Sequence, residues 1–158
     1  MNIGSWALLL LCVLHLHFGH TQPPPKLTLK DMPVMATNQL KITGIPKLNA
    51  KRFNINIGLG EENIALQFDV RFEFNNDRNT TVFCYKQNNS TWTNLVKDGH
   101  FPFEKGEEFK VTITFDKDEF LVKIPGNYIK SYPNHFGAEK FMLVRVQGDV
   151  RIKSFNIE

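Results

Sequence analysis

The chain has 158 residues, of which 42% are hydrophobic, and a formal net charge of +3. Its length suits a single domain with a substantial core. A charge this small, spread evenly along the chain, gives no support for nucleic acid or acidic lipid as a partner.

The N-terminus predicts secretion. An apolar run from Trp6 to Leu14 begins a few residues after Met1, and a triple proline, Pro23–Pro25, follows it. The run is shorter than the roughly 20 residues that span a bilayer, so we expect no membrane insertion; its length suits the hydrophobic part of a secretory signal peptide. No Lys or Arg precedes the run and no clean A-x-A cleavage pattern follows it, so the alternatives are an uncleaved anchor or a segment without a targeting function.

The N-terminal run also sets the expected domain boundaries. We expect residues 1–21 to be a signal peptide, cleaved after Thr21, and the protein to be secreted and extracellular. Residues 22–30 then form a Pro-rich lead-in segment, and residues 31–158 form one folded domain.

The cysteine content predicts a fold without an internal disulfide. Cys12 lies in the segment expected to be removed, which leaves Cys84 as the single cysteine. A secreted domain of this kind relies on its hydrophobic core. Cys84 is either a buried thiol or an exposed group able to link two chains.

Beyond the prolines the sequence is typical of short strands separated by turns. Phe109–Phe115 shows the pattern: Phe, Val, Ile and Phe alternate with Lys and two Thr. Turn signals such as Gly58–Gly60 recur at a spacing of about 8–12 residues, which predicts an all-β antiparallel sandwich or barrel with the fourteen Phe residues in its core. The expected strands are Lys26–Leu29, Gln39–Ile42, Phe53–Ile57, Ile64–Phe72, Thr80–Tyr85, Trp92–Val96, Phe109–Phe115, Phe120–Ile124, Tyr128–Tyr132, Phe141–Gln147 and Val150–Ile157.

The most informative segment is Ile64–Phe72, which reads I-A-L-Q-F-D-V-R-F. Its alternation predicts a half-buried strand with Ile64, Leu66, Phe68, Val70 and Phe72 toward a core. The opposite face, which starts at Ala65, displays the amide of Gln67, the carboxylate of Asp69 and the guanidinium of Arg71, roughly 7 Å apart. A solvated strand face is the ordinary interpretation, and a binding surface is the alternative.

Catalytic and cofactor motifs are missing from the sequence. Gly58-Leu59-Gly60 is a lone G-x-G that does not open a helix, and H-E-x-x-H, C-x-x-C, G-x-S-x-G and P-loop patterns do not occur. His100 and His135 do not stand at metal-ligand spacing from another candidate. We therefore expect a binding protein rather than an enzyme, with no cofactor and no metal. Asn79, Asn88 and Asn89 begin N-x-S/T sequons and are candidate glycosylation sites.

Several segments together resemble the galectin family, in the galectin order and with nearly galectin spacing. The similarity covers essentially the whole chain after about Asp31, and it implies a jelly-roll sandwich of two antiparallel sheets. It also implies a lectin that binds glycans or glycoproteins across the polar face of one sheet, for which a homodimer is possible. The segments are Ile64–Phe72, Asn79–Val82, Trp92, Phe101–Phe103, Gly106, Phe109–Asp116, Tyr132–Asn134 and Gly148–Ile152.

The sugar-binding positions implied by the resemblance are only partly retained. The family's H-F-N-P-R-F motif stands here as Gln67–Phe72. Arg71 is kept, and its fork of donors suits the oxygens of a galactoside. Gln67 replaces a histidine, and Asp69 replaces an asparagine and so removes donors. Asp69 lies two residues from Arg71 on the same face, where an ion pair would hold the guanidinium in place.

Two further motifs extend the expected site. The family's N-T-x-V-x-N stands as Asn79–Cys84, so Cys84 takes the position of a sugar-binding amide. The family's W-G-x-E-x-R keeps Trp92, whose ring would stack on galactose, but Leu95 replaces the carboxylate and Lys97 the second arginine. We expect a β-galactoside lectin with weakened lactose binding or altered specificity. The alternative is a protein of the same fold that has lost sugar binding and acts through protein contacts or as a structural component.

Overall fold

The computed structural model describes residues 25–158, and every regular element there is a strand. The expected signal peptide and the first three residues of the Pro-rich lead-in segment lie outside the described residues. All eleven expected strands are found in the expected order, so the all-β fold is confirmed. Their bounds are β1 (Pro25–Met35), β2 (Leu40–Pro46), β3 (Arg52–Gly60), β4 (Asn63–Phe74), β5 (Asp77–Lys86), β6 (Thr93–Asp98), β7 (Phe109–Phe115), β8 (Glu119–Ile124), β9 (Tyr128–Pro133), β10 (Lys140–Gly148) and β11 (Val150–Ile157).

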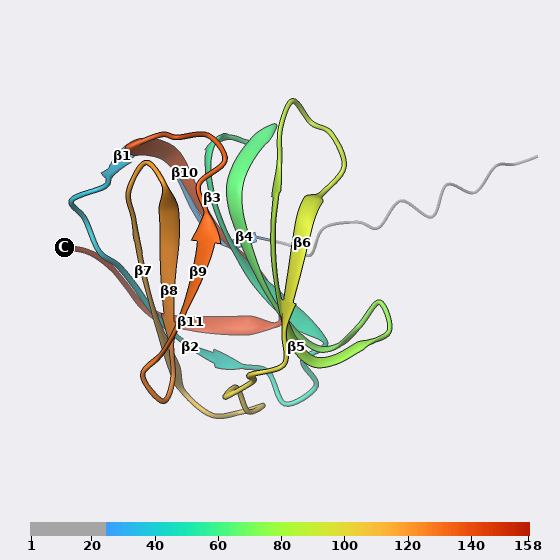
Figure 1. Ribbon diagram of the computed structural model, residues 1–158. Coiled ribbons are helices and arrows are strands. Elements are labelled where there is room, and N and C mark those ends of the chain that lie inside the picture. The colour runs from blue at the N-terminus through green and yellow to red at the C-terminus, as the bar shows by residue number, and fades with distance from the viewer. Residues whose placement is uncertain (1–24) are drawn as a thin grey trace, which may run out of the picture.

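The strands form two antiparallel sheets that enclose the core (Figure 1). One has six strands in the order β1-β10-β3-β4-β5-β6, and the other has five in the order β11-β2-β7-β8-β9. Strands that are distant in sequence, such as β1 and β10, therefore lie side by side. This is the jelly-roll sandwich expected from the resemblance.

Phenylalanine rings fill much of the space between the sheets, as the composition predicts. Phe53 of β3 stacks on Phe109 of β7, with ring centroids 4.9 Å apart, and meets Phe103 edge-on at 5.8 Å. Phe68 of β4 packs against Phe83 of β5 at 5.1 Å. Each large apolar side chain buried in this way stabilises the fold by about 1.5–3 kcal/mol. This aromatic core explains how a chain with one cysteine in its described part holds two sheets together.

The outer face of β4 is buried as well as its inner face, so the interpretation as a solvated strand face is wrong. Gln67, Asp69 and Arg71 are 2%, 0% and 8% exposed. Neighbouring polar side chains and Phe74 contact them and cover most of their surface. A polar strand face that is withdrawn from water in this way requires partners for every group it carries.

Two local expectations along β3 and β4 are also wrong. Gly58–Gly60 belongs to strand β3, and the turn falls at Glu61–Glu62 instead. Gly58 is needed because a Cβ there would lie 2.4 Å from the carbonyl oxygen of Asn63. The register between the two strands shifts near this point, so Ala65 joins the core and Ile64 lines a depression on the outer face. The shift reverses the faces predicted for these two residues.

Candidate functional site

The register of the six-stranded sheet aligns polar side chains from four neighbouring strands. Arg145 of β10 lies opposite Asn56 of β3, which lies opposite Gln67 of β4, which lies opposite Cys84 of β5. The adjacent row across the same strands is Gln147, Asn54, Asp69 and Val82, and it continues to Lys97 of β6. This outer face therefore carries a largely polar floor, which Val82 interrupts.

A cleft of about 410 Å³ opens over this floor. Five of the six side chains predicted to bind sugar line it, and Leu95, half exposed, lines it too. The sixth, Asp69, is fully buried and lies beneath the lining. The residues that line the cleft are Arg52, Gln67, Arg71, Phe74, Asn75, Asp77, Cys84, Trp92, Leu95 and Lys97.

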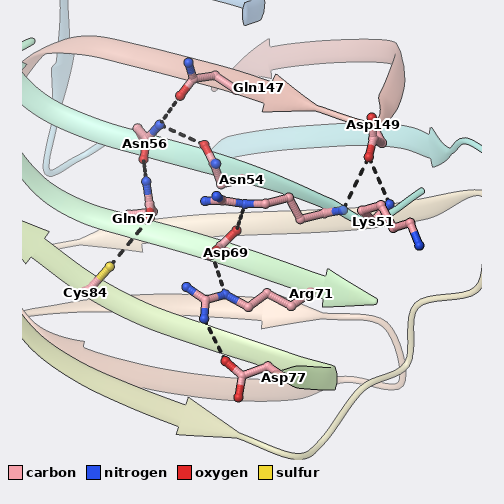
Figure 2. A network of polar contacts seen from close by, with 11 residues as sticks. Lys51, Asn54, Asn56, Gln67, Asp69, Arg71, Asp77, Cys84, Gln147 and Asp149 are labelled. Carbon is pink, nitrogen blue, oxygen red and sulfur yellow. Dashed lines mark hydrogen bonds and ion pairs between the residues drawn. The ribbon is translucent and has the colours of Figure 1, made fainter. Parts of the chain in front are cut away.

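Two carboxylates hold the arginines of the cleft. Asp69 accepts hydrogen bonds from Arg52 Nε at 3.1 Å and from Arg71 Nε at 2.7 Å, so the expected ion pair between Asp69 and Arg71 is present. Asp77 accepts from Arg71 Nη1 and from Lys97 Nζ, both at 2.7 Å. Figure 2 shows Arg71 between the two carboxylates. Because Arg71 and both carboxylates are largely withdrawn from water, their attraction is much less screened than that of surface pairs, whereas the side chain of Lys97 is half exposed.

The ion pairs of this network keep Arg71 and Asp77 in their charged forms. Burial alone would lower the pKa of Arg71, but Asp69 and Asp77 outweigh it and raise the pKa, so the guanidinium stays charged. Burial would raise the pKa of Asp77, but hydrogen bonds from Lys97 and Arg71 hold that pKa below its usual range. Asp77 therefore supplies, from the start of β5, a carboxylate on the face where Leu95 of β6 has none.

Phe74 covers the two arginines. Its ring centroid lies 4.1 Å from the guanidinium carbon of Arg52 and 5.3 Å from that of Arg71. Cation–π contacts at these distances contribute about 0.5–1 kcal/mol at exposed sites and more where water is excluded. The ring thus restricts both guanidinium groups to the position in which they flank Asp69.

A chain of amide hydrogen bonds crosses the other part of the floor (Figure 2). The thiol of Cys84 lies 3.7 Å from Gln67 Oε1, and Gln67 Nε2 donates to Asn56 Oδ1 at 3.0 Å. Asn56 Nδ2 then donates to Asn54 Oδ1 and Gln147 Oε1, both at 2.9 Å. The amide of Gln67 is therefore engaged by the protein, and a ligand has to compete for it.

Cys84 is a buried thiol rather than an exposed linking group. It is 1% exposed, and burial raises its pKa to about 12. The group at this position is thus neutral and a weak hydrogen-bonding partner, where the resemblance implies an amide. A disulfide to a second chain would require this part of β5 to open.

Trp92 lies at the border between two depressions. It lines the cleft described above, and it also lines a smaller depression together with Lys86 and Arg145. The ammonium of Lys86 lies 5.3 Å from the Trp92 ring. The ring is partly buried but does not belong to the core cluster of the described residues. The Trp92 ring therefore lies on the outer side of the sheet rather than in the core between the sheets.

Several residues of the site are not predicted from the sequence: Arg52, Phe74, Asn75 and Asp77 in the cleft, and Asn54, Asn56 and Gln147 in the amide chain. Arg52 is the first polar position of the alternating run R-F-N-I-N-I in β3. This alternation could have predicted that Arg52 lies on the polar face of its strand. Asp77 follows a two-residue hairpin turn in which Asn75 and Asn76 have φ of 49° and 64°. Both values suit a type I′ turn, and that tight turn places Asp77 opposite Phe74.

Other candidate features lie apart from this network. Within residues 25–158 no three His, Cys, Asp or Glu side chains are grouped as metal ligands, and no helix is long and apolar enough to cross a membrane. Asn79, Asn88 and Asn89 are exposed and have left-handed backbone conformations, with φ of 47°, 51° and 54°.

Known proteins match nearly all of the described chain. The sequence pattern of the galactoside-binding lectin family matches residues 25–157. Galactose-binding lectin l-1 of Anguilla japonica is 30% identical over 128 residues, which cover 81% of this chain and 89% of that lectin. The structure of lactose- and MES-liganded congerin II is 30% identical with a TM-score of 0.81 and covers 85% of this chain and all of that one. CG-16, a homodimeric agglutinin from chicken liver, is 30% identical with a TM-score of 0.79 and covers 84% of this chain and 98% of that one.

Proposed function

Because this chain belongs to the galectin family of galactoside-binding lectins, we propose that it is a secreted lectin that binds glycans in the cleft of its six-stranded sheet. Galectins are lectins and not enzymes, and binding here involves no catalysis. The expected signal peptide supports secretion. One observation carries the proposed site: the ring of Trp92 and the anchored guanidinium of Arg71 line the same cleft.

The two groups suit a sugar in complementary ways. An aromatic ring stacks on the apolar C–H face of a pyranose, and a guanidinium donates to its oxygens. Arg71 uses Nε and Nη1 for Asp69 and Asp77, and its Nη2 donates to no acceptor within residues 25–158. Because two carboxylates fix the guanidinium, little side-chain entropy is lost when a ligand binds it.

The ligand differs from a simple β-galactoside in our proposal. Cys84 offers a neutral thiol, Leu95 offers no acceptor, and the amide of Gln67 already bonds Asn56. Each missing hydrogen bond to a sugar hydroxyl costs roughly 1 kcal/mol. Three or four altered groups then lower the affinity for lactose by on the order of 10²–10³-fold. We expect weak lactose binding, or none, and a preference for another glycan.

A glycan array tests the site. The purified protein, presented multivalently, is compared with Trp92→Ala and with Leu48→Ala, which removes an exposed apolar side chain outside the cleft. We expect a defined set of unsulfated glycans to bind the wild type and Leu48→Ala but not Trp92→Ala, with lactose a poor competitor. If the folded wild type binds no glycan on the array, the alternative is favoured, in which a galectin fold acts through protein contacts or as a structural component.

We also propose that the protein forms a homodimer, in which two clefts would cross-link glycans. The similarity to the homodimeric chicken agglutinin supports this. β1 and β11 form edges of the two sheets and each offers unpaired backbone groups to a second chain. Light scattering at micromolar concentration gives the mass directly, and a monomer across that range would contradict the proposal.

A further inference from the structure

The outer face of the five-stranded sheet carries a cluster of lysines that lies apart from the cleft. Lys41 of β2 lies directly opposite Thr112 of β7, which lies opposite Lys123 of β8. Lys110 lies two residues from Thr112 along β7, on the same face. Because neighbouring strands are about 4.8 Å apart, the three lysines start within roughly 10 Å of one another.

Two adjoining depressions lie over this cluster. One has a volume of about 330 Å³ and the other about 260 Å³, and both are lined by Lys110, Thr112 and Lys123. The first also reaches Ile129, and the second extends to the turn at Gly126. Together they form an elongated groove in which Lys110, Thr112 and Lys123 line both halves.

The charge of the cluster is only partly balanced. Lys41 forms an ion pair with Glu158. Lys110 and Lys123 have no carboxylate partner within residues 25–158, and both are exposed. Opposite charges stabilise neighbouring positions of a sheet and like charges destabilise them. An anion that contacts both lysines would remove this repulsion.

We propose that this groove binds the sulfate groups of a sulfated polysaccharide. Lysine ammonium groups and threonine hydroxyls donate to sulfate oxygens, which are anionic acceptors without a fixed fork geometry. A shallow groove with two linked depressions suits an extended polyanion that places successive sulfates along it. The exposed aliphatic side chains of Leu121 and Ile129 provide an apolar margin for the sugar rings. This site is independent of glycan binding in the Trp92 cleft.

Retention on immobilised heparin tests the proposal with a charge-matched pair of variants. Lys110→Ala/Lys123→Ala removes the two unpaired lysines of the groove. Lys47→Ala/Lys140→Ala removes the same charge at exposed positions outside both depressions. We expect the groove variant to lose heparin affinity by roughly three- to thirty-fold, the range for two charge contacts, and the control to lose far less. Thermal unfolding confirms that both variants are folded.

Two further comparisons sharpen the result. Desulfated heparin should bind far more weakly than heparin, because carboxylates alone do not supply the sulfate pattern. Trp92→Ala should leave heparin retention unchanged, which separates this groove from the cleft. If both double variants lost the same amount of heparin affinity, heparin would be attracted only by net charge, and the proposal would be overturned. Failure of the wild type to bind heparin at physiological ionic strength would overturn it too.

Discussion

Asp69 and Arg71, two residues apart on the outer face of β4, form a buried ion pair in which Arg71 Nε donates to Asp69 Oδ2 at 2.7 Å. The second carboxylate oxygen accepts from Arg52 at 3.1 Å, so one fully buried carboxylate serves two guanidinium groups. Asp69 therefore acts on a ligand only through the arginines that it positions.

Asp69→Asn should destabilise the fold by about 3–5 kcal/mol, because removing one partner of a buried ion pair leaves the other uncompensated. Urea unfolding measures this as a lower midpoint. Glu73→Gln is the control, since Glu73 lies on the same strand but forms only exposed ion pairs, with Lys51 at 3.4 Å and Arg78 at 3.5 Å, and such pairs contribute little to stability. If Asp69→Asn lowered the free energy of unfolding as little as Glu73→Gln, the role given to Asp69 would be contradicted.

Asp77 should make stability depend on pH. Hydrogen bonds from Lys97 and Arg71 hold its pKa in the folded state below the usual carboxyl range. Its stabilising contribution is then fully present above the unfolded carboxyl pKa of about 4 and is lost as the pH falls through the lower folded pKa. Asp77→Asn should therefore be less stable than the wild type at pH 7, and the difference should shrink below pH 4. Urea unfolding across this pH range measures it, and a constant difference would argue against the network.

Cys84 should resist alkylation in the folded protein. With its pKa raised to about 12 by burial, almost no thiolate is present at pH 8, and the side chain is 1% exposed. Iodoacetamide followed by peptide mass spectrometry should label Cys84 in urea but not in buffer. Rapid labelling under native conditions would mean that β5 opens readily and would restore the alternative of an intermolecular disulfide.

The sequence alone predicted the strands and the polar face of β4, because both depend on alternation within a short segment. It did not predict Arg52 or Asp77 as parts of the site. Their roles depend on the register of β3 against β4 and on a two-residue turn, which bring distant positions together. The prediction assigned Ile64 and Ala65 to the wrong faces of β4 for a related reason: a one-residue register shift inverts a period-two pattern.

The turn that places Asp77 should tolerate glycine but not alanine at Asn76. Its φ of 64° is left-handed, which costs about 1–2 kcal/mol for a residue such as alanine and nothing for glycine. Asn76→Ala should therefore lower the free energy of unfolding, and Asn76→Gly should leave it equal or slightly higher. Asn156→Ala, on an exposed strand position without a positive φ, should change it by less than about 0.5 kcal/mol. Equal effects of alanine and glycine at position 76 would contradict the turn assignment.

Leu95→Glu should increase the affinity for lactose. Leu95 is half exposed in the lining of the cleft, so a glutamate fits there without burying a charge. It supplies a carboxylate at position 95 that no protein group occupies, whereas Asp77 already accepts from Arg71 and Lys97. A hydrogen bond from a sugar hydroxyl to a charged group is worth about 1.5–3 kcal/mol, which corresponds to a gain of roughly tenfold or more. Leu95→Gln has nearly the same size without the charge and should gain much less. Titration calorimetry with lactose compares the three proteins. A lactose affinity that stays the same in Leu95→Glu would show that the missing carboxylate does not limit binding, and would direct attention to Cys84 and Gln67 on the floor of the cleft.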